Sequence, residues 1–138
     1  MTAWLGVVSA EHARRGIGLG IVQIGHGKRA PLLRLHPGDG FVIYSPQERL
    51  GEPPRLRAFT AVGTVSESEV WQADEGDFKP FRRRMEWDAS GVPVPLDDLR
   101  GDLRLTAQPN WGYQLRRGLI PLDDEDFAAV RAAMRPET

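Results

Sequence analysis

The amino-acid sequence predicts a single β-rich α+β domain, residues 1–138, in which five or six short strands form a closed or nearly closed barrel with minor helices around it. Three observations favour this fold class. The chain has the length of one domain, and its hydrophobic fraction of 41% is enough to bury a core. The 15 glycines and 11 prolines interrupt the chain too often for long helices. Short stretches of β-branched and aromatic residues lie between these interruptions.

The first predicted elements are a strand and a helix. Residues Ala3–Ser9 (AWLGVVS) are apolar and β-branched, which predicts a buried strand. Ser9 then stands where the N-cap of a helix over Ala10–Arg15 would stand, and a capped helix start also leaves backbone N–H groups for a ligand. The next expected elements are an extended piece at Gly20–Ile24, a polar loop at Gly25–Arg29, a helical turn at Pro31–Leu35 and a strand at Phe41–Ser45.

The middle of the chain contains the longest strand signals. Leu56–Ala73 is the longest strand-like stretch, in which Phe59, Ala61 and Gly63 alternate with Thr60, Val62 and Thr64, and Gly63 indicates a bend or bulge. Pro80–Asp88 (PFRRRMEWD) is predicted to be a strand with two different faces. Arg83 shares the apolar face and is expected to point inward, whereas Arg82 and Arg84 are expected to face outward.

The C-terminal part combines short pieces with one clear helix. We expect a helical turn at Leu96–Leu99, a short strand at Leu103–Thr106 and a loop around Trp111. The terminal helix is predicted from a cap at Asp123 or Asp124, acidic residues in its first turn and an apolar face formed by Phe127, Val130 and Met134.

Composition excludes several classes of function. The formal net charge is −1, so a nucleic acid would have to be held by a local basic face. There is no cysteine, which removes disulfides and thiolate metal sites, and the three histidines show no tight ligand spacing. No signal peptide or bilayer-length apolar run is visible, so we expect a cytoplasmic protein without metal, cofactor or membrane partner, most simply a monomer. No nucleophile elbow, P-loop or dinucleotide fingerprint occurs.

A series of short motifs runs along nearly the whole chain. They are Trp4–Ser9 (WLGVVS), Gln23, His26–Lys28 (HGK), Pro37–Asp39 (PGD), Tyr44–Pro46 (YSP), Phe78–Arg84 (FKPFRRR), Trp111–Tyr113 (WGY) and Asp126–Phe127 in the terminal helix. Their order and spacing resemble the EVE domain family of the PUA-like superfamily, closest to its small stand-alone bacterial branch. The resemblance implies a PUA-like mixed β-barrel and a pocket for a nucleobase, a modified one, in DNA or RNA.

The resemblance also indicates a ligand class and one departure. The related YTH domains hold a methylated adenine in an aromatic cage, and modified cytosine in DNA is the usual proposal for EVE domains. Many EVE domains read Lys-Ser-Glu-Pro after the first strand, where this chain has Val8–Glu11 (VSAE). The serine is retained, so a role is carried over to Ser9 but not to Val8.

The residues expected to hold the base come from these motifs. They are Ser9, Gln23, His26, Gly27, Lys28, Tyr44, Ser45 and Trp111. An amide such as that of Gln23 both donates and accepts at a base edge, and Lys28 suits a phosphate. Trp111 is the first choice for stacking on the base and Tyr44 the second, although Tyr44 as half-buried packing is an equal interpretation.

A small basic rim is expected to meet the backbone phosphates. Its members are Arg83, Arg84 and Arg116, with Arg82 and Arg117 nearby in the sequence. The leading hypothesis is therefore a non-catalytic reader of a modified or flipped-out base. The alternatives are a module for structured RNA, an enzyme on a small nucleotide with His26 as general base, and a purely protein-binding module.

Overall fold

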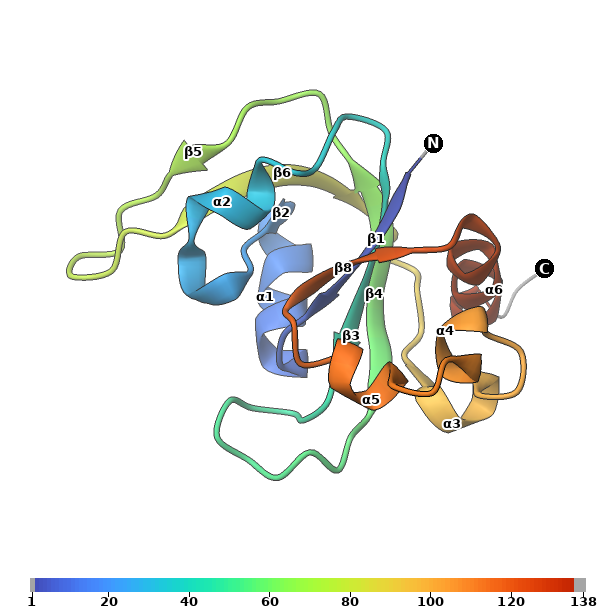
Figure 1. Ribbon diagram of the computed structural model, residues 1–138. Helices are drawn as coiled ribbons and strands as arrows, with labels where there is room; N and C mark the ends of the chain where they lie inside the picture. The colour runs from blue at the N-terminus through green and yellow to red at the C-terminus, as the bar shows by residue number, and fades with distance from the viewer. Residues whose placement is uncertain (1, 136–138) are drawn as a thin grey trace.

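The computed structural model describes residues 2–135 and shows one mixed sheet with short helices on both sides (Figure 1). The strand order is β2-β6-β4-β3-β1-β8, while β5 pairs with β6 and β7 pairs with β4. The eight strands are β1 (Ala3–Val7), β2 (Ile21–Val22), β3 (Gly40–Ser45), β4 (Ala58–Val65), β5 (Trp71–Gln72), β6 (Phe81–Trp87), β7 (Val94–Pro95) and β8 (Leu119–Leu122). The helices are α1 (Ala10–Leu19), α2 (Arg29–Leu32), α3 (Leu96–Leu99), α4 (Arg104–Ala107), α5 (Trp111–Gln114) and α6 (Asp124–Met134), with a 3₁₀ turn at Gly25–Gly27.

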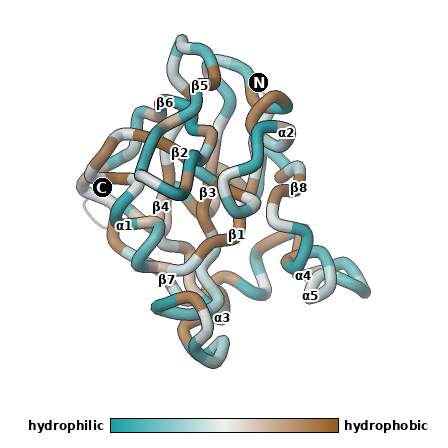
Figure 2. Tube along the Cα trace, turned by 90° about the vertical axis from the view of Figure 1, so that its left-hand side faces the viewer, coloured by the Kyte–Doolittle hydropathy of each residue, from teal (hydrophilic) through white to brown (hydrophobic). Residues whose placement is uncertain are grey.

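Strands β1 and β3 are neighbours in the sheet. They run parallel, with Leu5 opposite Val42, and the chain between them crosses over through α1, β2 and α2. All six residues of β3 are buried, because both faces of the sheet are covered. A strand covered on both faces is apolar throughout rather than alternating, as the sequence FVIYS shows. The hydropathy colouring in Figure 2 follows this arrangement, with brown stretches along β1 and β3.

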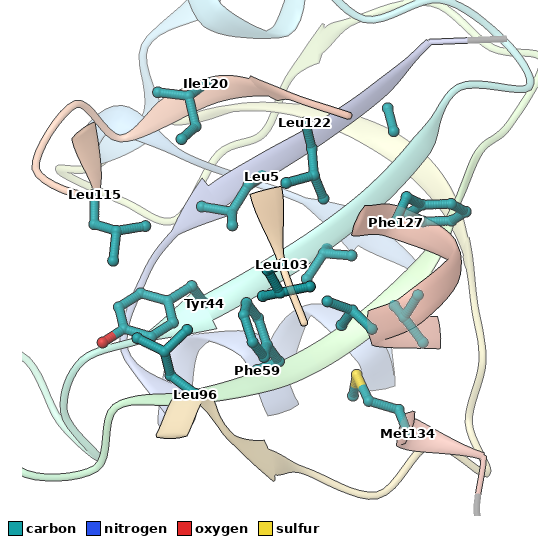
Figure 3. Close-up of a cluster of buried hydrophobic side chains, with 14 residues drawn as sticks. Leu5, Tyr44, Phe59, Leu96, Leu103, Leu115, Ile120, Leu122, Phe127 and Met134 are labelled. Carbon is teal, nitrogen blue, oxygen red and sulfur yellow. The ribbon is translucent and has the colours of Figure 1, made fainter. Parts of the chain in front are cut away.

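Two clusters of apolar side chains cover the two faces of the sheet. The first lies between the sheet and α6 with its neighbouring short helices, and it includes Leu5, Tyr44, Phe59 and Phe127 (Figure 3). The second cluster lies on the other face, on the side of α1 and α2. Its members include Trp4, Ile24, Leu32, Leu35, Phe41, Ile43 and Met85. The side chains of alternate residues of β1 and β3 therefore pack into different clusters.

The predicted helix caps are present. Ser9 is the N-cap of α1 and its side chain accepts from the backbone N–H of His12, while Asp123 caps α6 and accepts from the N–H of Glu125. Helix α1 continues to Leu19, further than expected, and ends at Gly20 in the left-handed conformation. Gly16, within this helix, leaves no room for a side chain, because an added Cβ would lie 2.9 Å from the carbonyl oxygen of Ile21.

The predicted fold class is confirmed, and several details differ. The sheet has eight strands rather than five or six, because four-residue β8 and the two-residue strands gave no separate signal. The strand expected at Leu103–Thr106 is wrong. Leu103 points into the core, and helix α4 begins after it because the buried carboxylate of Asp126 accepts from the N–H groups of Arg104 and Leu105 at 2.8 and 2.9 Å.

Two further expectations for the strands need correction. The register shift in β4 lies opposite Ile43 and Tyr44, not at Gly63; Gly63 is instead required because a side chain there would collide with the backbone of Glu86 and Trp87 on β6. The loop expected around Trp111 contains the short helix α5. Within residues 2–135, no helix has the length and apolar character needed to span a membrane.

Candidate functional site

A cavity of about 680 Å³ is bordered by the segment that follows strand β2 and the segment that precedes strand β8. The start of α1 and the turn that leads from α5 to β8 border it as well, and these segments can be located in Figure 1. The residues that line it are Val7, Val8, Ser9, Glu11, His12, Arg15, Gln23, Ile24, Gly25, His26, Pro46, Leu50, Leu115, Arg116, Arg117 and Gly118. This volume is in the range of pockets that hold small organic ligands.

The walls of the cavity are fixed by backbone hydrogen bonds. The N–H of Val7 donates to the carbonyl of Gly118 at 2.9 Å, which holds the segment before β8 against the end of β1. The N–H of Val8 donates to the carbonyl of Tyr44 at 3.3 Å. These two bonds hold the end of β1 between the segment that precedes β8 and the end of β3, and residues of the first two segments line the cavity.

Ser9 lies at the base of this wall, with 9% of its surface exposed. Its hydroxyl oxygen accepts from the N–H of His12 at 3.3 Å. The N–H groups of Ala10 and Glu11 donate to the carbonyls of Gln47 and Glu48 at 3.0 and 2.9 Å. The start of α1 consequently has its first donors bonded within the protein, which contradicts the expectation that they would face a ligand.

Gln23 is the second buried polar residue of the cavity, with 9% of its surface exposed. Arg82, on β6, donates from Nε to Gln23 Oε1 at 2.9 Å, so the amide is held in one orientation. The ring of His12 lies with Nε2 at 2.7 Å from the main-chain oxygen of Gln23. One residue next to strand β2 is thereby connected to both α1 and β6.

Arg82 is itself held by Glu75, in the loop between β5 and β6. Arg82 Nη2 donates to Glu75 Oε2 at 2.6 Å, and Arg15 of α1 donates to the same oxygen. The hydrogen bond from Arg82, together with the positive charge of Arg15, lowers the pKa of the Glu75 carboxyl. Glu75 is therefore an ionised carboxylate that orients two arginines at neutral pH.

His26 stands in an unusual backbone turn at the rim of the cavity. Gly25, His26 and Gly27 have φ values of 58°, 59° and 81°, and His26 is exposed. The left-handed region disfavours a residue with a side chain, so this turn holds the His26 imidazole at the rim at some conformational cost. Gly27 is buried against Pro80, and Lys28 follows as an exposed residue that does not line the cavity.

Positive charge gathers around the opening. Arg116 and Arg117 line the cavity, as does Arg15, which is paired with Glu75, and the acidic residue of the lining, Glu11, is paired with Arg49. An adjoining cavity of about 270 Å³ shares part of the same wall. It is lined by Ile24, Gly25, Ala30, Pro31, Arg34, Arg117, Gly118 and Leu119. A protein of near-zero net charge thus has a local basic rim at this site.

The aromatic residues expected to stack on a base lie elsewhere. Tyr44 is a member of the first core cluster, 4% exposed and in edge contact with Phe59 (Figure 3), and burial raises the pKa of its hydroxyl. Ser45 is fully buried, with Oγ 2.7 Å from Thr60 Oγ1. Trp111 is half-buried against the core beneath the guanidinium of Arg100. Neither Tyr44 nor Trp111 borders the cavity, whose aromatic rings are the imidazoles of His12 and His26.

The arginines of β6 also lie apart from the opening. Arg83 points inward as expected, is 7% exposed and donates to the carbonyl of Leu35 at 3.0 Å. It is therefore not placed to meet a phosphate at the surface. Arg84 faces outward and lies over the ring of Trp71, 5.1 Å from the centroid. Of the three residues expected at phosphates, Arg116 alone borders the cavity.

Four of the expected site residues thus meet at one cavity, namely Ser9, Gln23, His26 and Arg116. Sequence reasoning missed His12, whose role depends on a contact with Gln23 eleven positions away. It also missed the apolar wall of Val7 and Leu115. The position of His12 three residues after a helix cap is a usable signal, because a cap and its i+3 partner share one end of the helix.

Comparison with known proteins gives the family. The sequence profile of the EVE domain matches residues 2–133. A UPF0310 protein of Renibacterium salmoninarum is 47% identical over 135 residues, covering 98% of this chain and 96% of its own. A UPF0310 protein of Mesorhizobium japonicum is 48% identical over 135 residues, covering 95% of this chain and 90% of its own.

Solved structures agree with the fold. An NMR structure of a Rhodopseudomonas palustris protein superposes with a TM-score of 0.63 at 14% identity, covering 100% of this chain and 96% of its own. A crystal structure of an Agrobacterium tumefaciens protein superposes with a TM-score of 0.58 at 15% identity, covering 96% and 92%. The profile match and the close relatives together show that this chain belongs to the EVE domain family, which has a PUA-like fold.

Proposed function

We propose that this protein binds a nucleic acid by holding one nucleobase, a modified or extruded one, in the 680 Å³ cavity without transforming it. The observation that carries the proposal is the pairing of two buried polar side chains, Ser9 and Gln23, with an aliphatic wall. A base needs this combination, because its faces are apolar and its edges form hydrogen bonds.

The wall residues suit the faces of a flat ring. Val7 and Val8 come from the end of β1, and Leu115 and Pro46 come from other segments of the lining. In place of the expected tryptophan or tyrosine, the imidazoles of His12 and His26 are the rings available for stacking. Aliphatic walls select a flat ring by its shape. Space left beside the ring would accommodate a substituent such as a methyl group.

Features around the cavity favour a nucleotide within a chain over a free base. Arg116 and Arg117 at the opening suit phosphates. The adjoining 270 Å³ cavity is mainly apolar, shares Arg117 with the first and has Arg34 on its wall. It offers room for the base of a neighbouring nucleotide. A single-stranded segment, or a duplex with an extruded base, would supply both the phosphates and the neighbouring base.

The test is a titration of short single-stranded oligonucleotides, followed by fluorescence anisotropy. One oligonucleotide carries a plain or modified base at its centre, and a matched one carries an abasic site there. The proposal predicts clearly tighter binding of the oligonucleotide with the base. Equal binding of the two, or binding only of folded RNA, would contradict it.

Charge reversal tests the rim. The double variant Arg116→Glu and Arg117→Glu should weaken binding strongly and reduce its salt dependence. The variant Arg29→Glu together with Lys79→Glu makes the same change in net charge at exposed residues that do not line the 680 Å³ cavity. Similar losses in both double variants would indicate attraction by charge at large rather than binding at this cavity.

A further inference from the structure

The amide of Gln23 is oriented by a chain of charged side chains. Glu75 accepts from Arg82 Nη2 at 2.6 Å, and Arg82 Nε donates to Gln23 Oε1 at 2.9 Å. Arg15 of α1 donates to Glu75 as well, so the carboxylate is held from two sides. The amide oxygen of Gln23 is therefore engaged within the protein, and its Nε2 group, with two N–H donors, points to the other side.

Gln23 lies between two cavities, and this position indicates which of them its Nε2 group faces. Gln23 borders the 680 Å³ cavity and also a much smaller one, while Arg82 borders only the smaller one. The oxygen that accepts from Arg82 thus faces the smaller cavity. The Nε2 donors are left for the larger cavity, in a side chain that is 9% exposed.

The neighbouring polar atoms show the same bias. The oxygen of Ser9 accepts from the N–H of His12, which leaves the Ser9 O–H proton to donate. The main-chain oxygen of Gln23 accepts from His12, because a carbonyl oxygen cannot donate. The oxygens of Ser9 and Gln23 are thus bonded within the protein, and the Ser9 O–H and Gln23 N–H groups remain as donors for the ligand.

We propose that this wall selects a base edge that presents hydrogen-bond acceptors. The class is the keto bases, such as uracil, thymine, hypoxanthine and guanine, in preference to their amino counterparts cytosine and adenine. Arg82 and Glu75 then act as positioning residues, because they fix the orientation of Gln23. This inference rests on the proposed function, and it differs from the modified cytosine that the family resemblance suggests.

The preference follows from the consequence of turning the amide. To accept from an amino group, Gln23 would have to direct Oε1 into the cavity and place Nε2 against Arg82 Nε. Two donors would then face each other in a buried position, and the hydrogen bond from Arg82 would be lost. A buried donor without a partner is costly enough to lower affinity by about tenfold.

The experiment compares matched pairs of trinucleotides with a varied central base. The pairs are inosine against adenosine, uridine against cytidine, and 5-methyluridine against 5-methylcytidine. Each pair exchanges a keto oxygen and the adjacent ring N–H for an amino group and an unprotonated ring nitrogen, on a ring of the same size. The dissociation constants should favour the keto member of every pair by about tenfold. Equal affinities, or a preference for the amino members, would overturn the inference.

Two variants test the role of orientation. Gln23→Glu replaces the amide with a carboxylate, which only accepts, so the preference should reverse toward amino bases. Arg82→Met removes the donor that fixes the amide, so the keto-to-amino affinity ratio should fall toward one. The control is Arg84→Met, two residues along the same face of β6, where the guanidinium lies over Trp71.

The outcomes separate this inference from the proposed function. If no trinucleotide binds to the wild-type protein, both fail. If trinucleotides bind through the cavity without a keto preference, only the inference fails. An unchanged ratio in Arg82→Met would overturn the positioning role of Arg82, whereas a changed ratio in Arg84→Met would show that the effect is not specific to Gln23.

Discussion

His12 Nε2 lies 2.7 Å from the main-chain oxygen of Gln23, so helix α1 is attached directly to the segment that follows strand β2. The oxygen is an acceptor, and the imidazole therefore donates. The N–H of the same His12 is held by Ser9. The two buried polar residues of the cavity are thus fixed by one residue of α1, rather than lying on an independent loop.

Replacing His12 should therefore affect both stability and binding. In His12→Ala the buried Gln23 loses the donor to its main-chain oxygen, and we expect the free energy of unfolding to fall by about 1 to 2 kcal/mol. Affinity for an oligonucleotide should fall as well, because Gln23 is less firmly placed. Urea unfolding and anisotropy titration measure the two effects. His36→Ala is the control, since the His36 side chain is 77% exposed; an equal loss there would contradict the role given to His12.

The backbone of His26 predicts a separation of stability from binding. His26→Gly removes the side chain from a left-handed residue, so the melting temperature should stay level or rise. Binding should weaken, because a ring at the rim of the cavity is lost. Arg57→Gly is a matched control, since Arg57 is also left-handed, with φ 48°, and does not line the cavity. A large loss of stability in His26→Gly would show that the imidazole is structural.

Gly27 should tolerate no side chain. Its φ is 81°, and an added Cβ would lie 2.7 Å from Cβ of Pro80. Gly27→Ala should therefore destabilise the protein by more than the conformational term of about 1 kcal/mol. Gly38→Ala isolates that term, because Gly38 has φ 87° and open space around it. Equal changes in the two unfolding midpoints would contradict the close packing of Gly27.

Asp88 predicts a pH-dependent contribution to stability. Hydrogen bonds from Ser90 and then from Arg135 lower the pKa of the Asp88 carboxyl below its ordinary value of 3.8. A lowered folded-state pKa contributes stability above the ordinary value, and this contribution is lost as the pH falls through the folded-state pKa. Asp88→Asn should lower the urea midpoint at pH 7, and its difference from wild type should shrink below about pH 4.

The control for that prediction is an exposed aspartate. Asp98 lies on α3, so Asp98→Asn should leave the midpoint nearly unchanged at both pH values. If the Asp88→Asn difference were as large at pH 2 as at pH 7, the ionised carboxylate would not be its cause. Arg135, just beyond the end of α6, would then contribute through packing alone.

The features that could be predicted from the sequence are mostly local. The caps at Ser9 and Asp123 depend on residues within one helical turn, and the strand at Phe41–Ser45 depends on a continuous apolar run. The family resemblance added the fold and placed Ser9, Gln23 and His26 at one site. These predictions need no knowledge of which strands pair.

The features that were missed depend on distant contacts. The partner of Gln23 is Arg82, 59 positions along the chain, and nothing in either neighbourhood indicates the pairing. Tyr44 is buried because α6 and its neighbours cover that face of β3, so a strand end that could have been a pocket wall is core. Asp126, expected only to favour the start of its helix, also holds the start of α4.

The most direct test of the account is the side-chain amide resonance of Gln23, followed by two-dimensional ¹H–¹⁵N NMR during titration with a uridine-centred trinucleotide. The Gln23→Glu variant identifies the signal by its disappearance. If Gln23 donates to the base, its Nε2 protons should shift strongly, while the exposed amides of Gln72 and Gln108 should stay in place. Saturable binding that leaves the Gln23 amide signal unmoved would contradict this role of Gln23.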